Sequence, residues 1–401
     1  MTTKHYKKIA LSTLLALVTV SNLVPGTTYA AQNMGKVQTT YANVAATTDT
    51  YALGPDGLRV AMEKTGSNVL AMDLYALTVL KQANVNFSGI DSLDASLKTK
   101  VLHHQGVAKN NASQWLDAIK PQLILTNQNI INYNTKFQNY YDTLVKAVQE
   151  KNKDTLTTGL TRLSTSISEN KAQVDTLISN LKTFRDKLTR DTQSFKEDSN
   201  QVTSILASQD AGIPLLQKQL ETYNAAASKY NSIIIGSSVA TALGPVAIVA
   251  GAVVIWTGAG TPLGVGLIAT GVGATGAGAT GIVLAKKELD NAQTEIQKIA
   301  GQITQAQLEV AGLTNVKTQT EYLTATIDTA IIALQNISNQ WHTMNTKYTS
   351  LLQNVKTISP ENLGFIMEDL EIAKDSWKDI KDYAEKIYAK DIQVVDGKSI
   401  K

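Results

Sequence analysis

Residues 156–205 read LTTGLTRLSTSISENKAQVDTLISNLKTFRDKLTRDTQSFKEDSNQVTSI. Apolar residues recur in this stretch at alternating intervals of three and four, the spacing that keeps one stripe of a helix facing a partner helix. At 1.5 Å per residue, one helix over this stretch is about 75 Å long, far longer than the diameter of a compact globule. The stretch therefore predicts an elongated helical bundle. Its stripe consists of Leu156, Leu160, Leu163, Ile167, Asn170, Val174, Leu177, Leu181, Phe184, Leu188, Asp191, Phe195, Asp198, Val202 and Ile205.

Three polar residues, Asn170, Asp191 and Asp198, interrupt this stripe. A polar residue at a seam position either fixes the register of two helices or marks a place where the seam faces water. The sequence leaves both interpretations open.

Similar stripes run from Ile130 to Ala147, from Leu323 to Val355 and from Leu363 to Ile387. Ser359 and Pro360 separate the last two, and they predict a cap and the first position of a new helix. Strand-like alternation is nearly absent. The predicted fold class is therefore mainly α, an elongated bundle of about five long helices with a small head.

Two further signals locate the ends of helices. Pro121 predicts a break or kink near the start of the second helix. Residues 54–57, Gly-Pro-Asp-Gly, predict a turn before an N-terminal helix of about 25 residues.

The N-terminus has the three parts of a secretory signal peptide. Lys4, Lys7 and Lys8 are basic, residues 9–20 are apolar, and small residues stand at 28 and 30. We therefore assign residues 1–30 to a signal peptide, with Ala31 as the mature N-terminus. An uncleaved anchor is the alternative, but its apolar run is too short to span a bilayer of about 30 Å.

The mature charge balance excludes one class of partner. Removing three lysines and no acidic residue from a chain with 37 basic and 34 acidic residues leaves 34 of each. A neutral chain has no excess of positive charge to neutralise nucleic-acid phosphates. The chain also has no cysteine, so apolar burial must stabilise it outside the cell without disulfides.

Residues 230–285 form the most unusual segment, because they contain no Asp, Glu, Lys, Arg or His and hold twelve of the 25 glycines. Two arms, 233–256 and 263–285, flank the turn Thr-Gly-Ala-Gly-Thr-Pro at 257–262. Each arm is about 35 Å long as a helix, enough for a hydrocarbon core of about 30 Å. The segment predicts a hairpin that crosses a membrane twice.

The composition of this segment predicts a switchable element. Small residues four apart allow close packing of transmembrane helices, and glycine lowers the preference for helix in water. Helix and β-hairpin both remain open for the water-soluble form. We expect the hairpin turn at Gly258, Gly260 and Pro262. We expect the membrane-inserting residues to be Ile233, Ile234, Ile235, Val239, Leu243, Val246, Ile248, Val249, Val253, Val254, Ile255, Trp256, Leu263, Val265, Leu267, Ile268, Val272, Ile282, Val283 and Leu284.

Two other interpretations of the segment are weaker. A buried core hairpin would seldom need 56 uncharged residues beside charged amphipathic helices. A permanent membrane span would usually carry a basic cytoplasmic flank and a signalling domain. Here both flanks resemble the same exported bundle.

Cofactor and catalytic signals are weak. Residues 271–276 and 276–281 match the dinucleotide fingerprint G-x-G-x-x-G, but no alternation of strand and helix surrounds them. His103 and His104 are adjacent, so they point about 100° apart on a helix and lack a third ligand at metal-binding spacing. We expect no cofactor, no metal site and no catalytic residues, and therefore no enzyme.

The signal peptide, the heptad helices, the absence of cysteine and the central apolar hairpin together resemble the cytolysin A type of α-helical pore-forming toxins. More narrowly, residues 232–236 (SIIIG) and 244–251 (GPVAIVAG) resemble the B-component branch of the tripartite non-haemolytic enterotoxins, relatives of haemolysin BL. The resemblance implies a rod-shaped body, a small head with a β-hairpin in the soluble form, and two further secreted toxin components as partners.

The sequence thus predicts a signal peptide (1–30), a helical bundle in two parts (31–229 and 286–401) and a membrane-active head (230–285). We expect a secreted, extracellular toxin component that oligomerises at the target-cell membrane, with membrane lipid as a partner. The alternative is a coiled-coil adhesion or structural protein of the cell surface that never enters lipid.

Overall fold

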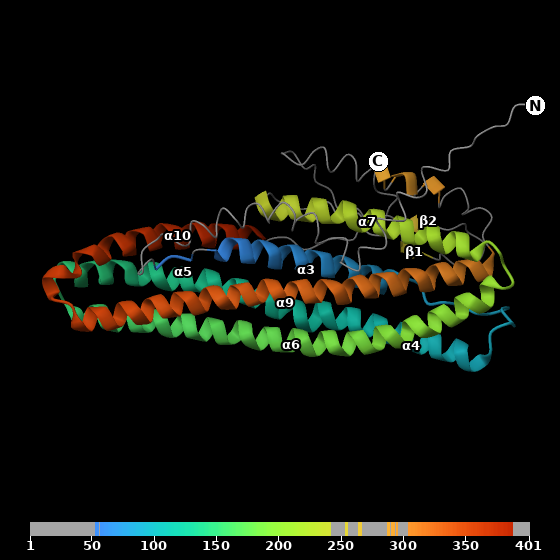
Figure 1. Ribbon diagram of the computed structural model, residues 1–401, viewed down its shortest axis with the longest axis horizontal. Coiled ribbons are helices and arrows are strands. Elements are labelled where there is room, and N and C mark those ends of the chain that lie inside the picture. The colour runs from blue at the N-terminus through green and yellow to red at the C-terminus, as the bar shows by residue number, and fades with distance from the viewer. Residues whose placement is uncertain are drawn as a thin grey trace, which may run out of the picture.

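A computed structural model describes residues 53–55, 57–241, 253–255, 264–266, 287–288, 290–292, 294–295 and 304–387. In this part of the chain, long helices lie side by side along one axis and form a rod (Figure 1). The predicted elongated helical bundle is confirmed. The predicted signal peptide lies outside the described residues.

The described elements are mostly helices, with two short strands. The α-helices are α3 (Leu58–Lys81), α4 (Ala95–Gln114), α5 (Lys120–Gln149), α6 (Lys153–Ala207), α7 (Ile213–Thr241), α9 (Gln305–Thr357) and α10 (Ile366–Ile387). A π-helical turn, η1 (Trp115–Ile119), joins α4 to α5, and a 3₁₀ turn, η2 (Pro360–Phe365), precedes α10. The strands are β1 (Val253–Ile255) and β2 (Gly264–Gly266).

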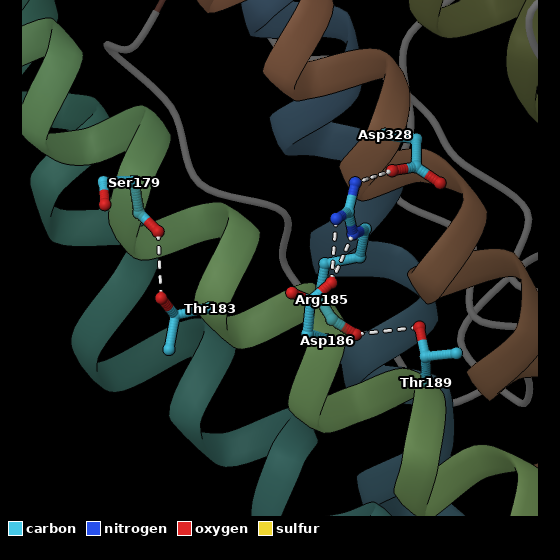
Figure 2. Close-up of polar contacts among 6 residues, drawn as sticks. All are labelled: Ser179, Thr183, Arg185, Asp186, Thr189 and Asp328. Atoms are coloured by element: carbon cyan, nitrogen blue, oxygen red, sulfur yellow. Dashed lines mark hydrogen bonds and ion pairs between the residues drawn. The ribbon is translucent and has the colours of Figure 1, made fainter.

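The two longest helices, α6 and α9, pack antiparallel through the middle of the rod. Nearly all apolar residues of the predicted α6 stripe are buried, and Ile205 at its end is partly buried. At the surface of the seam, Arg185 Nη1 donates to Asp328 Oδ1 at 2.9 Å, and Arg185 Nε and Nη2 donate to Asp186 Oδ1 (Figure 2). Exposed pairs of this kind contribute about 0–1 kcal/mol each, so the apolar stripe supplies most of the stability of the seam.

Threonine and serine side chains on the outer faces bond to their own helices. Thr183 Oγ1 donates to the Ser179 carbonyl at 3.1 Å, and Thr189 Oγ1 donates to the Arg185 carbonyl at 2.8 Å (Figure 2). This bond to the carbonyl four residues earlier satisfies a hydroxyl without leaving the helix. The hydroxyl groups on these faces are therefore satisfied within their own helix.

An aromatic cluster closes the core between α5, α9 and α10. The rings of Trp341 and Trp377 stack at 5.9 Å, and Tyr133 lies 4.5 Å from Trp377. The Trp377 indole N–H donates to the Leu53 carbonyl at 3.3 Å, which ties the chain before α3 to α10. Three of the four predicted helical stripes therefore meet in this cluster.

The polar interruptions of the α6 stripe contact α4. Asp198 is buried and pairs with His104 Nδ1 at 2.8 Å and with Lys100 Nζ at 3.3 Å. Asp191 Oδ2 accepts from Asn111 Nδ2 at 3.1 Å. These two residues therefore fix the position of α4 on α6, whereas Asn170 is only partly buried.

The break predicted at Pro121 takes the form of the π-helical turn immediately before it. Pro121 follows the π-helical turn within a helix that runs on from α4 into α5, and the wider turn is a usual way to accommodate the missing N–H of proline. Buried Asp73 on α3 accepts from Trp115 Nε1 at 2.9 Å and pairs with Lys120 Nζ at 2.7 Å. The π-helical turn thus presents both donors to one carboxylate.

The cap predicted at Ser359 was wrong in detail. The Ser359 side chain caps no backbone N–H, and its hydroxyl donates to the Glu361 carboxylate. Pro360 begins a 3₁₀ turn, and α10 starts only at Ile366. The turn before α3 is as predicted, since Gly57 has φ 79°, a conformation that glycine adopts without strain.

Candidate functional site

Helix α7 leads directly into the uncharged segment. It crosses residue 230 and continues to Thr241, so Ile233, Ile234, Ile235 and Val239 are helical. The side chain of Ile235 is only 3% exposed and belongs to the core of the rod. The first part of the segment is therefore continuous with the body.

Polar side chains form much of the seam that holds α7 on α3 and α9. Ser228 Oγ lies 3.1 Å from Tyr75 OH, and Gln319 Nε2 donates to Asn224 Oδ1 at 3.4 Å. These four residues are buried, as is Asn231. Burial raises the pKa of the Tyr75 hydroxyl, which keeps it neutral.

Several polar atoms along this seam have no partner within the described residues. They are Gln219 Oε1, Tyr223 OH, Asn224 Nδ2, Asn231 Oδ1 and Gln319 Oε1. A buried polar atom without a hydrogen bond costs about 1–3 kcal/mol, whereas a buried apolar side chain stabilises its seam. The α7 seam therefore combines buried apolar side chains, such as Leu216, Leu220 and Ile235, with buried polar atoms that lack a partner in the described residues.

The strands β1 and β2 pair antiparallel. Val253 lies opposite Gly266, Val254 opposite Val265, and Ile255 opposite Gly264. Residues 256–263 connect the strands, and the predicted turn residues Gly258, Gly260 and Pro262 fall in this connection, outside the described residues. In the soluble form the uncharged segment thus contains both helix and a β-pair, which resolves the alternative that the sequence left open.

An ion pair joins the two flanks of the uncharged segment. Lys229 Nζ lies 2.7 Å from Glu288 Oε2 and 2.9 Å from Glu288 Oε1. Both side chains are substantially exposed, so the pair contributes at most about 1 kcal/mol. Its value is geometric, because it brings the two borders of the uncharged segment together.

The strand β1 contacts α3 and α9, so the body carries part of the segment on its side (Figure 1). Among the helices of the described residues, none has the length and apolarity needed to cross a bilayer. The other predicted membrane-inserting residues lie outside the described residues: Leu243, Val246, Ile248, Val249, Trp256, Leu263, Leu267, Ile268, Val272, Ile282, Val283 and Leu284.

Asp210 ties the turn between α6 and α7 to the start of α9. Its Oδ1 accepts from the Gly212 N–H at 2.9 Å and from Gln307 Nε2 at 3.0 Å, and its Oδ2 accepts from Thr304 Oγ1 at 2.9 Å. Thr304 also begins α9 with a capping box that includes Gln307. One carboxylate therefore holds the point at which the chain re-enters the body.

Replacing Asp210 by alanine is expected to lower the free energy of unfolding by about 1–2 kcal/mol, because three donors lose their acceptor. Asp210→Asn keeps one acceptor oxygen and should lose less. Urea denaturation followed by circular dichroism measures both variants. Equal stability of Asp210→Ala and wild type would contradict this role.

The metal and nucleotide signals find no support in the described part of the chain. His104 pairs with Asp198, and the rings of His103 and His104 lie 5.4 Å apart. No three His, Asp or Glu side chains come together there as a metal site. Both glycine-rich fingerprints fall outside the described residues.

Sequence reasoning missed the Lys229–Glu288 pair, Asp210 and the polar α7 seam. The ion pair had one signal, namely the acidic Glu288 two residues beyond Lys286, opposite in charge to Lys229 on the other border. The apolar side of the seam was readable in the three- and four-residue spacing of Ile213, Leu216, Leu220, Tyr223 and Ala227, whereas its buried Asn, Ser and Gln have no periodic signal.

Several known proteins are similar to this chain in sequence or in structure. The family model for Bacillus haemolytic enterotoxin (HBL) matches residues 52–230. An uncharacterised protein in the hblA 3′ region of Bacillus cereus is 31% identical over 158 residues, which span 39% of this chain and 95% of that protein.

Solved structures of toxin components are also similar to this chain. The Bacillus cereus HblL1 toxin component is 35% identical, with a TM-score of 0.74 over 86% of this chain and 100% of that chain. The soluble AhlB of the tripartite α-pore-forming toxin AHL from Aeromonas hydrophila shares the fold, with 18% identity and a TM-score of 0.63 over 83% of this chain and 92% of that chain. These relatives are toxin components rather than enzymes. The chain belongs to the Bacillus haemolytic enterotoxin (HBL) family.

Proposed function

We propose that this chain is a secreted component of a multicomponent pore-forming toxin. It inserts the uncharged segment, residues 230–285, into the membrane of a target cell. The observation that carries the proposal is the position of this segment, whose two flanks meet at Lys229 and Glu288 on the side of a rigid helical rod. Membership of the HBL family supports it.

The proposed mechanism begins with a segment kept on the body in water. Buried Ile235 holds its first part, the polar contacts of Asn224 and Ser228 hold α7 just before it, and β1 rests on α3 and α9. In a bilayer every backbone polar group must be satisfied within the protein, so the segment must become helix or closed barrel. Its two arms are long enough to cross as helices. The lipid-facing side chains are the apolar residues named above, and Gly258, Gly260 and Pro262 form the tip.

The polar α7 seam favours this change. Detaching α7 from α9 exposes Asn224, Ser228 and Asn231 to water, where each regains hydrogen bonds. An apolar seam of the same area would resist detachment more strongly, at about 25 cal/mol per Å². The seam of α6 and α9 buries a longer apolar stripe, so in this mechanism it stays closed while α7 detaches.

The partners proposed are two other secreted toxin components and membrane lipid, with oligomerisation at the membrane. The HblL1 protein is a toxin component and AhlB belongs to a tripartite toxin, and both share this fold. The chain acts by insertion and has no catalytic activity. Residues 1–30 direct its export, and the helical body consists of 31–229 and 286–401.

Dye release from liposomes tests the proposal. The mature protein, combined with the two partner components, should release calcein, and each component alone should release much less. Binding of the complete set to liposomes without dye release would contradict pore formation and favour an adhesive coiled-coil protein.

A further inference from the structure

The loop between α3 and α4, residues 82–94, is fastened to neighbouring helices by polar side chains. The Val85 N–H donates to Gln105 Oε1 at 3.0 Å, and Gln105 Nε2 donates back to the Ala83 carbonyl at 2.8 Å. Asn315 Nδ2 on α9 donates to Gln82 Oε1 at 2.9 Å. The loop is therefore held from both α4 and α9.

Glu309, in the second turn of α9, makes one of these contacts. The Asn86 N–H donates to Glu309 Oε2 at 2.8 Å, and the Gln305 amide donates to Glu309 Oε1. Glu309 is only 7% exposed. A cavity of about 20 Å³ adjoins it, which is room for one water molecule. The cavity is lined by Gln82, Ala83, Asn84, Val85, Asn86, Leu308, Glu309 and Gly312.

No cation neutralises the Glu309 carboxyl group within the described residues. On α4, Lys109 Nζ donates to Asn84 Oδ1 at 2.7 Å, and in the loop Asp94 caps α4 through the Leu97 N–H. Asp210, in the turn before α7, accepts from α9 as described above. On α4, Lys100 and His104 pair with Asp198, Lys98 is partly buried and His103 is exposed. Lys81 at the end of α3 and Asp91 in the loop are exposed, and Lys317 lies two turns further along α9.

Burial without a counter-ion favours the neutral carboxyl group. It raises the pKa of Glu309 to about 7, although the hydrogen bonds from Asn86 and Gln305 act in the opposite direction. When the loop opens and the group is hydrated, its pKa returns towards the ordinary value of 4.5. The closed loop therefore binds more protons than the open loop between these two pH values. By linkage, closure is strongest below about pH 4.5, weakens as the pH rises to about 7, and is constant above that.

We propose that Glu309 is a proton-operated latch that holds the α3–α4 loop on α9 when neutral and loosens it when ionised, and that loosening eases release of the head. The second part rests on the proposed function. The link to the head rests on position. The latch joins the loop after α3 to α9, and β1 contacts both α3 and α9.

Hydrogen exchange tests the latch without lipid or partners. The observable is exchange of the Val85 and Asn86 amides, corrected for the intrinsic pH dependence of exchange. Opening should increase roughly ten- to a hundredfold between pH 5 and pH 8 in the wild type. In Glu309→Gln, which keeps the shape and an acceptor oxygen, opening should be the same at both pH values. Glu169→Gln, on the exposed face of α6, is the matched control and should follow the wild type.

A wild type without this pH dependence, or a Glu309→Gln variant that retains it, overturns the latch. Dye release separates the two parts of the proposal. Release should be faster at pH 8 than at pH 6 for wild type and Glu169→Gln, and equal at both for Glu309→Gln. If opening of the loop depends on pH but the pH dependence of dye release is the same in Glu309→Gln as in the wild type, only the claim that the loop controls release of the head is overturned. A functioning latch in a protein that never releases dye contradicts the proposed function and not the latch.

Discussion

Replacement of Val249 by aspartate is expected to abolish dye release while leaving the protein folded and secreted. Val249 lies near the middle of the first arm, where contact with lipid would be most complete. A carboxylate at the centre of a membrane helix costs about 2.5–3.5 kcal/mol. That is roughly a hundredfold in the insertion equilibrium of each subunit, and an oligomer multiplies the effect.

The controls for this variant separate insertion from folding. Val249→Ile keeps the arm apolar and should release dye at the wild-type rate. Gln335→Glu adds a carboxylate on the exposed surface of α9, outside the segment, and should also remain active. Helical circular dichroism and binding to the partner components should be unchanged in all three variants. Release at the wild-type rate by a folded Val249→Asp protein would show that this arm does not cross the bilayer.

Replacement of Trp377 by alanine is expected to lower the free energy of unfolding by about 3–5 kcal/mol, the range for removing a large aromatic side chain from a core. The side chain is fully buried, stacks on Trp341 and donates a hydrogen bond to the Leu53 carbonyl. Trp377→Phe fills part of the space and should lose less. Urea denaturation gives both values.

Trp377→Phe also tests whether the helical body and the membrane-active head act independently. Trp377 lies in α10, whereas β1 rests on α3 and α9. At a temperature where Trp377→Phe is fully folded, its dye release should therefore equal that of the wild type. A loss of release without a loss of folded protein would mean that the aromatic cluster takes part in insertion.

The body of the rod could be predicted from the sequence because its core is apolar and periodic. The stripe beginning at Leu156 became α6, and the stripe beginning at Leu323 became the later part of α9. The spacing did not predict that α9 begins at Gln305, in a part where polar residues such as Glu309 and Asn315 are buried too. Pro121 marked a real break, although spacing could not reveal that the break is a π-helical turn held by Asp73. That contact depends on α3, which is distant in sequence.

The sequence identified the candidate site by its composition but did not predict its secondary structure. The absence of charge between Lys229 and Lys286 marked the segment, but it did not indicate that α7 continues to Thr241 or that Val254 pairs with Val265. Glycine, alanine and valine are compatible with helix and strand alike, so packing on the body decides between them. The buried Asn224 and Ser228 were not identified because polar core residues have no periodic apolar signature.

The central claim is that the uncharged segment enters the hydrocarbon core. Because the chain has no cysteine, a single Val249→Cys substitution allows one fluorophore to be attached at that position, and Gln335→Cys provides the body control. Each labelled protein is assembled with the partner components on liposomes that carry quenchers deep in the acyl chains. The account predicts strong quenching of the label at 249 and none of the label at 335. Dye release from the same liposomes, with the label at 249 quenched only by a water-soluble quencher, would contradict it.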